Sequence, residues 1–416
     1  MKMGNILFVS TRFRALQHRN FRLFFVGQLV SLIGTWMQST AQLWLVYRLT
    51  HSPALLGIFG FASQIPILLL ASFGGYVADR YNRHRCVIWT QTVSMILAFG
   101  LAALTLIGVV RVWEIILIGF LAGIVNAFDV PIRQAFLAHM VGKEELPNAI
   151  ALNSSIFNGA RVVGPAIAGL AIAWVGEGWC FFLNGASFLA VIIALRMMRL
   201  EKFERHAGTG SPLQDLIQGF HFAMSDRPIR SALLLLSMLS MFGMQYSVLL
   251  PIFANAILHG GAGRLGLLMS FAGVGALIGA LHFAARTNYK GLAEWIAATS
   301  LMFALALVLF SQSRVFWLSG VTLLIVGFAA TSQMAATNTI VQSRVPDRLR
   351  GRVMAVYATM FMGVQPIGAL LAGGVAKRIG AAYTVAAFAT VCLLGSLFFI
   401  FGVMVRLGQP EPSTEA

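Results

Sequence analysis

Residues 75–85, Gly75-Tyr76-Val77-Ala78-Asp79-Arg80-Tyr81-Asn82-Arg83-His84-Arg85, form a short charged loop between two long apolar runs, which is the pattern of a turn between two membrane-spanning helices. The runs cover about 53–77 and 86–110, and each exceeds the roughly 20 apolar residues that a helix needs to cross a membrane. Asp79 is costly at a membrane surface unless it is paired, and Arg80 and Arg83 are available partners. Gly75 predicts a close approach of two helices.

The whole chain repeats this alternation of apolar runs and charged loops. Of its 416 residues, 58% are hydrophobic and 11% are charged, whereas soluble proteins carry about 25% charged residues. The continuous runs argue against a β-barrel, whose strands alternate over about 10 residues. We predict an all-α membrane protein with 12 transmembrane helices in two six-helix halves. The expected spans are 23–47, 53–77, 86–110, 113–137, 149–175, 179–198, 230–257, 263–285, 292–312, 315–339, 353–376 and 382–405.

The basic residues predict the orientation. With both termini in the cytoplasm, 23 of the 30 Lys and Arg lie in inner segments and 6 in outer ones, which is the bias that cytoplasmic loops show. The remaining one, Arg161, lies inside a span. This topology accounts for the net charge of +16, so no nucleic-acid partner is expected.

The two halves are related. Residues 141–176 align without gaps on 345–380, and the identical pairs include Gly164 with Gly368 and Gly169 with Gly373. We expect an N-terminal half over 1–199, a cytoplasmic linker with an amphipathic helix over 200–228, and a C-terminal half over 229–416. Parallel six-helix repeats are a known transporter arrangement. The linker helix is predicted to lie on the inner membrane surface, and an ordered linker is the alternative.

The charged loop resembles the loop motif of the major facilitator superfamily, with Asn82 where that motif has its second glycine. Because Asn tolerates a left-handed turn, we expect the turn to persist. Asp129-Val130-Pro131-Ile132-Arg133-Gln134-Ala135 and Val345-Pro346-Asp347-Arg348-Leu349-Arg350-Gly351-Arg352-Val353-Met354 are similar to the branch that includes the enterobactin exporter. The resemblance implies alternating access, with a cytoplasmic gate formed by Gly75, Asp79, Arg80, Arg83, Asp129 and Arg133. It also implies that Asp129 pairs with an arginine of the 80–85 loop.

The segment Asn158-Gly-Ala-Arg161-Val-Val-Gly164-Pro165-Ala-Ile-Ala-Gly169 is similar to the Gly-Pro helix motif of proton-coupled drug exporters. Gly164, Pro165 and Gly169 are predicted helix-packing residues, since glycine permits close packing and proline bends a helix. Ordinary packing of small residues is the alternative.

Arg161 is the main candidate for binding a substrate, because a charge inside a span needs a cavity or a partner. A structural arginine bonded to carbonyls or glutamines is the alternative. The 204-residue repeat offset matches it with Gln365. Gln28, Ser31, Thr35, Gln38 and Gln42 form one polar stripe on the first span, facing a cavity or another helix. The predicted substrate contacts are Arg161, Gln38, Gln42, Asn158 and Gln365.

We expect no acidic residue in the middle of a span. Proton antiport is therefore implied by the resemblance and not by a buried carboxylate, and Asp79 and Asp129 are the candidates for the residue that carries the proton. The sequence shows no phosphate loop, metal-ligand spacing or catalytic set, so neither an enzyme nor a cofactor nor a bound metal is expected. We predict a monomeric secondary transporter of a bacterial inner membrane that exports a siderophore-like or drug-like small molecule. A multidrug or macrolide-type exporter is the alternative, followed by a lipid scramblase or a channel.

Overall fold

The protein is all-helical over the part that the computed structural model describes, which is residues 14–199, 212–286 and 291–404. In those ranges, 11 helical segments are long and apolar enough to cross a membrane. Helix α2 (Arg19–Thr50) has 32 residues but is not among the 11, because its glutamines, serines and threonines lower its hydropathy. The predicted count of 12 is reached when α2 is counted as a span.

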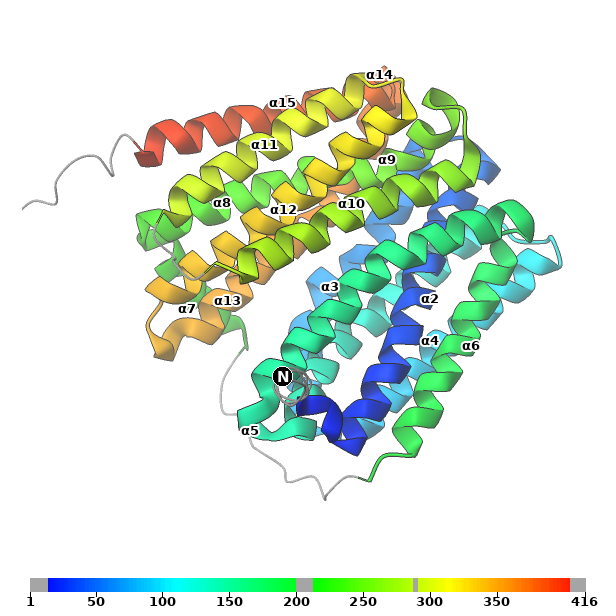
Figure 1. Ribbon diagram of the computed structural model, residues 1–416, viewed down its shortest axis with the longest axis horizontal. Helices are drawn as coiled ribbons and strands as arrows, with labels where there is room; N and C mark the ends of the chain where they lie inside the picture. The colour runs from blue at the N-terminus through cyan, green and yellow to red at the C-terminus, as the bar shows by residue number, and fades with distance from the viewer. Residues whose placement is uncertain (1–13, 200–211, 287–290, 405–416) are drawn as a thin grey trace, which may run out of the picture. The chain divides into compact units, whose positions relative to one another are not determined.

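The chain forms two compact units, drawn in Figure 1. The described part of unit 1 comes from residues 14–51, 62–199 and 260–270. The described part of unit 2 comes from 52–61, 212–259, 271–286 and 291–404. Two short segments, 52–61 and 260–270, therefore pack with the unit that holds the other half of the sequence. The predicted boundaries between the halves did not include this exchange.

Unit 1 packs around a core of large apolar side chains, among them Phe21, Val87, Ile132, Phe136 and Leu195. A kink at Gly142, with φ 71°, divides its longest helix into the spans Val112–Ala138 and Glu144–Trp174. Its elements are η1 (Arg14–Gln17), α2, α3 (Pro53–Arg80), α4 (Arg83–Leu106), α5 (Val112–Trp174) and α6 (Glu177–Arg196), with the first turns of α3 in unit 2.

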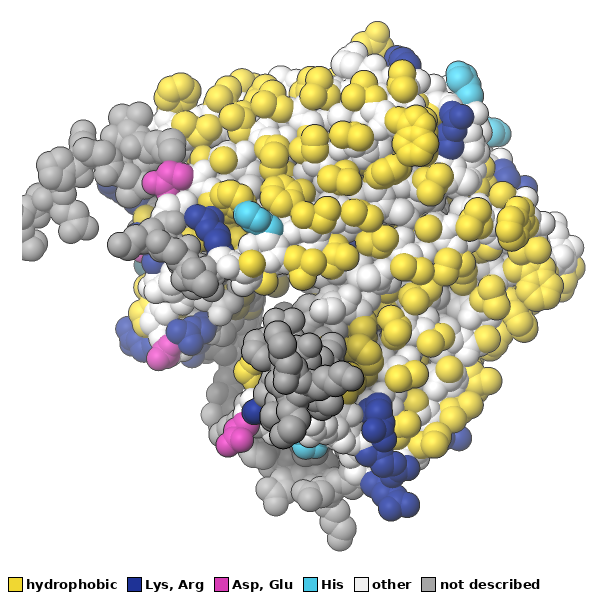
Figure 2. Space-filling view, in the orientation of Figure 1, with side chains coloured by type: hydrophobic (Ala, Val, Ile, Leu, Met, Phe, Trp, Pro, Cys, Tyr) yellow, Lys and Arg dark blue, Asp and Glu magenta, His cyan; other side chains and the backbone are white. Residues whose placement is uncertain are grey.

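Unit 2 has a core in which Ile229, Leu233 and Leu236 pack on Val353 and Val356. Helices α11 and α15 lie side by side (Figure 1), and hydrophobic side chains are numerous on the face of this unit that Figure 2 shows. Its elements are α7 (Pro212–Ser225), α8 (Arg227–Met241), η2 (Gly243–Gln245), α9 (Tyr246–Ile252), η3 (Phe253–Ile257), α10 (Gly261–Ala284), α11 (Leu292–Gln312), α12 (Phe316–Arg344), η4 (Asp347–Leu349), α13 (Arg350–Ala358), η5 (Thr359–Gly363), α14 (Gln365–Ile379), α15 (Ala381–Phe399) and η6 (Ile400–Met404), and the first turns of α10 belong to unit 1.

Glycines at matching positions of the repeat have the same structural role in both units. Gly164 of α5 crosses α2, where an added Cβ would lie 2.5 Å from the Cβ of Trp36, and Gly368 of α14 lies against the carbonyl of Met241 in α8. Gly176 and Gly380, a matching pair further along the repeat, both have a φ of 88°. These positions need glycine for close contact or for a left-handed φ, which explains why the two halves share glycine there.

Helix α7 covers the stretch for which a surface helix is predicted. Leu216 and Ala223 pack into the core of unit 2, while Ile217 and Phe220 are exposed. Gly219 lies against the backbone of Arg352, so α7 is fixed to the start of α13. Its position relative to a membrane stays a prediction.

Candidate functional site

Arg161 lies in the middle of the span Glu144–Trp174, 13 residues or about 20 Å along the helix axis from its end. Its guanidinium carbon is 5.8 Å from the ring centre of Trp36 on α2. The Trp36 ring in turn meets Phe157, one helical turn before Arg161, edge to face at 5.8 Å. The arginine is half-buried and, among the described residues, has no hydrogen bond or ion pair. Within the described chain, a cation beside the Trp36 ring is therefore left without a counter-ion.

Asn158 and Gln365 are both half-buried and bonded within their own helices. The Asn158 amide donates to the Ser154 carbonyl at 2.9 Å, and the Gln365 amide donates to the Phe361 carbonyl at 3.3 Å. Asn158 lies in unit 1 and Gln365 in unit 2. Each amide can exchange a bond within its helix for a bond to another partner.

The polar stripe of α2 packs inside unit 1. Gln28 accepts from Arg133 of α5 at 2.7 Å, and Gln38 accepts from Asn184 of α6 at 2.8 Å. Gln42 is 7% exposed, and its side-chain amide nitrogen has no hydrogen-bond partner among the described residues. The stripe thus contacts neighbouring helices, the second of the two environments that polar side chains in a span can have.

Asp129 is a buried carboxylate within the span Val112–Ala138 and is 5% exposed. It accepts hydrogen bonds from Thr90 at 2.6 Å and Gln91 at 3.0 Å, and Arg133, one turn further along α5, lies 3.5 Å away. It lies nine residues from the end of this span, which agrees with the expectation that no acidic residue is in the middle of a span. The expected partner is wrong, because Arg133 takes the place of an arginine from the 80–85 loop.

The charged loop joins α3 to α4 through local contacts. Asp79 is exposed and lies 3.9 Å from Arg83, while Arg80 packs over the Tyr76 ring at 4.4 Å. Arg83 donates to the carbonyls of Ala78 and Ala135, at 2.9 and 3.3 Å, and so ties the end of α3 to α5.

Two local expectations for this loop need correction. Gly74, not Gly75, makes the close approach, because a Cβ on Gly74 would collide with the backbone of Ala127 in α5, whereas one on Gly75 would meet nothing within 4 Å. Asn82 has an extended φ of −62° and accepts from the backbone amide of Arg85, so it caps α4 and forms no left-handed turn. A cap is a common role for asparagine, and it satisfies an amide that the helix start leaves free.

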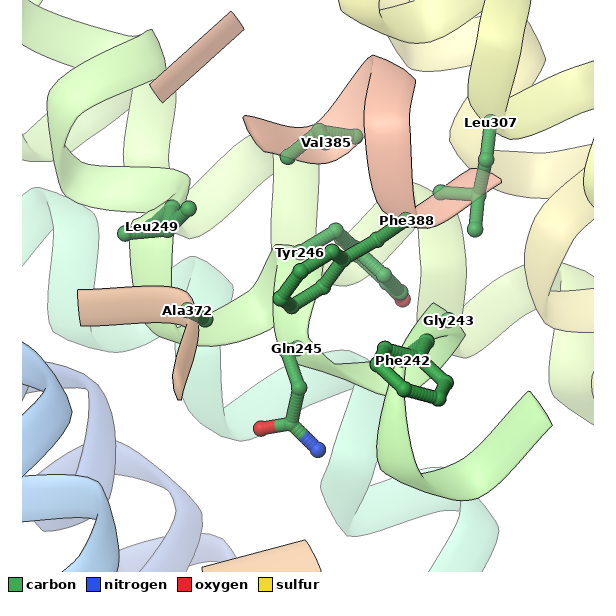
Figure 3. Close-up of a pocket in the computed structure, with 9 residues that line it drawn as sticks. All are labelled: Phe242, Gly243, Gln245, Tyr246, Leu249, Leu307, Ala372, Val385 and Phe388. Carbon is green, nitrogen blue, oxygen red and sulfur yellow. The ribbon is translucent and has the colours of Figure 1, made fainter. Parts of the chain in front are cut away.

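Sequence reasoning missed two interruptions of spans in unit 2. The span Arg227–Ile257 breaks at Phe242–Gln245, and the span Asp347–Ile379 contains a π-helical turn at Thr359–Gly363. Figure 3 shows Phe242, Gln245 and Tyr246 at the first break, where they line a small pocket with Phe388 of α15. Gly243 and Pro366 were available signals, since glycine and proline both favour departures from an α-helix. The described residues contain no group of His, Cys, Asp or Glu that could hold a metal ion.

Comparison with known proteins gives the class of this fold. The solved structure of the nucleoside transporter NupG matches with a TM-score of 0.71 at 12% identity, covering 94% of this chain and 100% of that one. A bacterial homologue of the lysosomal transporter Spinster, in an inward-facing conformation, matches with a TM-score of 0.72 at 13% identity, over 95% and 99% of the two chains. The fold is that of a multi-pass membrane transporter.

The family follows from sequence. A family model described as "Transmembrane secretion effector" matches residues 10–414, and the chain belongs to this family of the major facilitator superfamily. It is 27% identical to the staphyloferrin A transporter of Staphylococcus aureus, over 91% of this chain and 96% of that protein. It is 26% identical to the enterobactin exporter EntS of Escherichia coli O1:K1, over 94% and 92%. The multidrug efflux pump Tap of Mycolicibacterium fortuitum is 25% identical, over 86% and 89%. The chain is thus an efflux-type transporter of small molecules, and not an enzyme.

Proposed function

We propose that this transporter exports an anionic, siderophore-like small molecule across the bacterial inner membrane by alternating access and proton antiport. The observation that carries the proposal is Arg161, a guanidinium in mid-span with an aromatic neighbour and no counter-ion in the described chain. A charge at this depth is tolerated where it faces water or a partner, and an anionic substrate supplies the partner. The names of two relatives, which are a siderophore transporter and a siderophore exporter, support the same substrate class.

The proposed substrate contacts are Arg161 and Asn158 of unit 1 and Gln365 of unit 2. Arg161 supplies charge, Trp36 and Phe157 supply flat apolar surface, and the amides supply hydrogen bonds. Gln42 belongs to the same set, because its side-chain amide nitrogen has no hydrogen-bond partner among the described residues and can donate to a substrate. Gln38 would join only by exchanging its bond to Asn184 for a bond to substrate.

Proton coupling is proposed to run through Asp129. It is a buried carboxylate, and the charged group facing it is Arg133, which also donates to Gln28. Protonation of Asp129 would weaken its attraction to Arg133 and so loosen the link between α5 and α2. Asp79 is exposed, so it suits the predicted gate with Arg80 and Arg83 better than proton coupling. The orientation proposed is with both termini in the cytoplasm.

Transport by proteoliposomes tests the substrate class. Purified protein with an imposed pH gradient is given enterobactin, staphyloferrin A or the cation ethidium, and wild type is compared with Arg161→Ala and Arg161→Lys. We expect saturable, gradient-dependent movement of a siderophore that falls at least tenfold in Arg161→Ala, since a charge-assisted hydrogen bond contributes about 1.5–3 kcal/mol. Arg161→Lys should retain part of it, because lysine keeps the charge but loses the planar, bidentate geometry.

The second candidate is a multidrug exporter, favoured by the similarity to Tap. Ethidium movement that is indifferent to Arg161→Ala, with no siderophore movement, would establish that function and overturn the siderophore proposal. Normal siderophore transport by Arg161→Ala would leave the substrate class standing and remove Arg161 from the site.

A further inference from the structure

At the first interruption in unit 2, a backbone carbonyl accepts its hydrogen bond from a side chain. Helix α8 ends at Met241, a 3₁₀ turn follows, and α9 begins at Tyr246. At this break the amide of Gln245, which is 3% exposed, donates to the Ser240 carbonyl at 2.9 Å. In an apolar environment a backbone group released from a helix needs such a partner. Gln245 therefore stabilises the break and holds Ser240 at the end of α8.

The second interruption lies opposite Ser240. A π-helical turn directs each carbonyl towards the amide five residues further along the chain. For Phe361 that residue is Pro366, which has no amide hydrogen. The Phe361 carbonyl instead accepts from the hydroxyl of Ser240 and, at 3.3 Å, from the side-chain amide of Gln365. One carbonyl thus has two side-chain donors, and one of them is a proposed substrate contact.

Close packing holds these two interruptions beside each other. Gly368, one turn after Gln365, lies so close to α8 that a Cβ there would be 2.8 Å from the Gln245 amide nitrogen and would collide with the Met241 carbonyl. On the other side of the break, Phe242 meets the ring of Phe388 edge to face at 5.2 Å (Figure 3). Ser240 is 1% exposed, so its hydroxyl is buried at this contact.

We propose that Ser240 is a positioning residue for Gln365. The inference rests on the proposed role of Gln365 in substrate binding. With the Ser240 hydroxyl on the Phe361 carbonyl, Gln365 can turn its amide to a substrate while the carbonyl keeps a donor. Without that hydroxyl, the same movement leaves the part-buried Phe361 carbonyl without a side-chain donor, which is unfavourable inside a membrane span. Ser240 thus lowers the free energy needed to make the Gln365 amide available.

The matching place in unit 1 is built differently. Arg161 stands where the repeat has Gln365, α2 runs unbroken past the crossing at Gly164, and no π-helical turn occurs in the described residues of α5. The guanidinium of Arg161 attracts an anion through its charge. It does not have to break a hydrogen bond to a backbone carbonyl first, as Gln365 does. This positioning role is therefore proposed for the neighbourhood of Gln365 and not for that of Arg161.

A double-mutant cycle tests the inference. Transport of enterobactin into proteoliposomes is measured for Ser240→Ala, Gln365→Ala and the double variant. We expect each single variant to raise KM on the order of tenfold with little change in maximal rate, because both remove the same hydrogen bond to substrate. In the Gln365→Ala background, Ser240→Ala should change KM less than about twofold. Ser240→Thr, which keeps the hydroxyl, should restore the wild-type KM.

Ser396→Ala is the matched control, because the Ser396 hydroxyl is also buried in unit 2 but bonds only to Cys392 in its own helix. It should leave KM unchanged. If Ser240→Ala does not accumulate as folded protein, Ser240→Cys, which has the same branching and a weaker donor, gives the same readout. Additive effects of Ser240 and Gln365, or a wild-type KM for the Ser240 variant, would overturn the inference. A wild-type KM for Gln365→Ala would instead remove Gln365 from the proposed site.

Discussion

At the scale of single residues, Asp129 is the group whose charge the fold has to accommodate. An isolated carboxylate is unfavourable inside a membrane, and the structure surrounds this one with two neutral donors and one arginine. A proton bound here would remove the charge, yet Thr90 and Gln91 would still have an acceptor. Protonation would therefore leave these two bonds in place and weaken the attraction to Arg133.

Asp129→Asn should uncouple transport from the pH gradient. Asparagine keeps an acceptor oxygen for Thr90 and Gln91 but cannot take up or release a proton. We expect gradient-driven enterobactin accumulation to fall to the level seen without a gradient, whereas counterflow, in which labelled substrate exchanges with unlabelled substrate, continues. Both are measured in the same proteoliposomes, with the internal and external pH set independently.

Asp79→Asn serves as the control for Asp129→Asn, since Asp79 is exposed. It should keep gradient dependence even where its rate falls. Gradient-driven accumulation that persists in Asp129→Asn would rule out Asp129 as the coupling group, and its loss in Asp79→Asn instead would move that role to the charged loop.

Residue identities at the site could be predicted from sequence, but residue partners could not. Arg161, Asp129 and the 75–85 loop stand out because charge is rare in an apolar chain. Which of Gly74 and Gly75 faces α5 depends on the rotation of α3, and two adjacent glycines give no signal to choose between them. The pairing of Asp129 with Arg133 depends on side-chain directions within α5, and the resemblance to a family suggested a different partner.

At the scale of elements, the crossing of α2 and α5 sets the position of the Trp36 ring. Gly164→Ala should lower transport strongly, because its Cβ would lie 2.5 Å from the Cβ of Trp36 and 2.9 Å from the Ile33 carbonyl. The helices must then separate, and the ring that packs on Arg161 moves with α2. We expect a lower thermal unfolding temperature and at least roughly a tenfold rise in KM, measured in detergent and in proteoliposomes respectively.

Gly159→Ala is the matched control in the same helix, since an added Cβ there meets nothing within 4 Å. It should be neutral or slightly stabilising, because alanine favours a helix over glycine by up to about 1 kcal/mol. Equal effects of the two substitutions would show that helix propensity, and not the crossing with α2, explains the loss.

The spans could be predicted from the apolar runs, whereas their interruptions could not. A run of apolar residues has the same hydropathy whether it is straight or broken, and Phe242–Gln245 contains only a single glycine as a signal. The π-helical turn at Thr359–Gly363 depends on tertiary contacts, above all the Ser240 hydroxyl on Phe361. Pro366 is a local signal for a departure from the α-helix, but nothing in the local sequence specifies a contact to a residue 121 positions away.

At the scale of the whole molecule, the internal repeat extends to conformation. Gly176 and Gly380 share a φ of 88°, and Gly169 and Gly373 each meet one of the two exchanged segments. The repeat was visible in the sequence as identical glycines, but the exchange of segments 52–61 and 260–270 was not. Both exchanged segments are the first turns of long helices, so only the packing of their ends assigns them to a unit.

Helix α2 decides the topology of the molecule, because both termini lie on one side of the membrane only if α2 crosses it. Its 32 residues span about 48 Å, more than the roughly 30 Å of hydrocarbon. Its low hydropathy does not prevent insertion, since Gln28 bonds to Arg133 and Gln38 to Asn184, so these polar groups contact protein and not lipid.

Reporter fusions therefore test α2 directly. Green fluorescent protein, which fluoresces in the cytoplasm, should be fluorescent at both termini of the full chain, and alkaline phosphatase, which is active outside, should be inactive at both. A phosphatase inserted between α4 and α5, at 107–111, should be active, because the basic residues predict that this turn lies outside. An active phosphatase at the N-terminus together with a fluorescent C-terminus would show that α2 does not cross and would reduce the count to the 11 apolar spans. Phosphatase activity at both termini would keep 12 spans but reverse the orientation, and with it the side on which Asp79 and Arg83 could act as a gate.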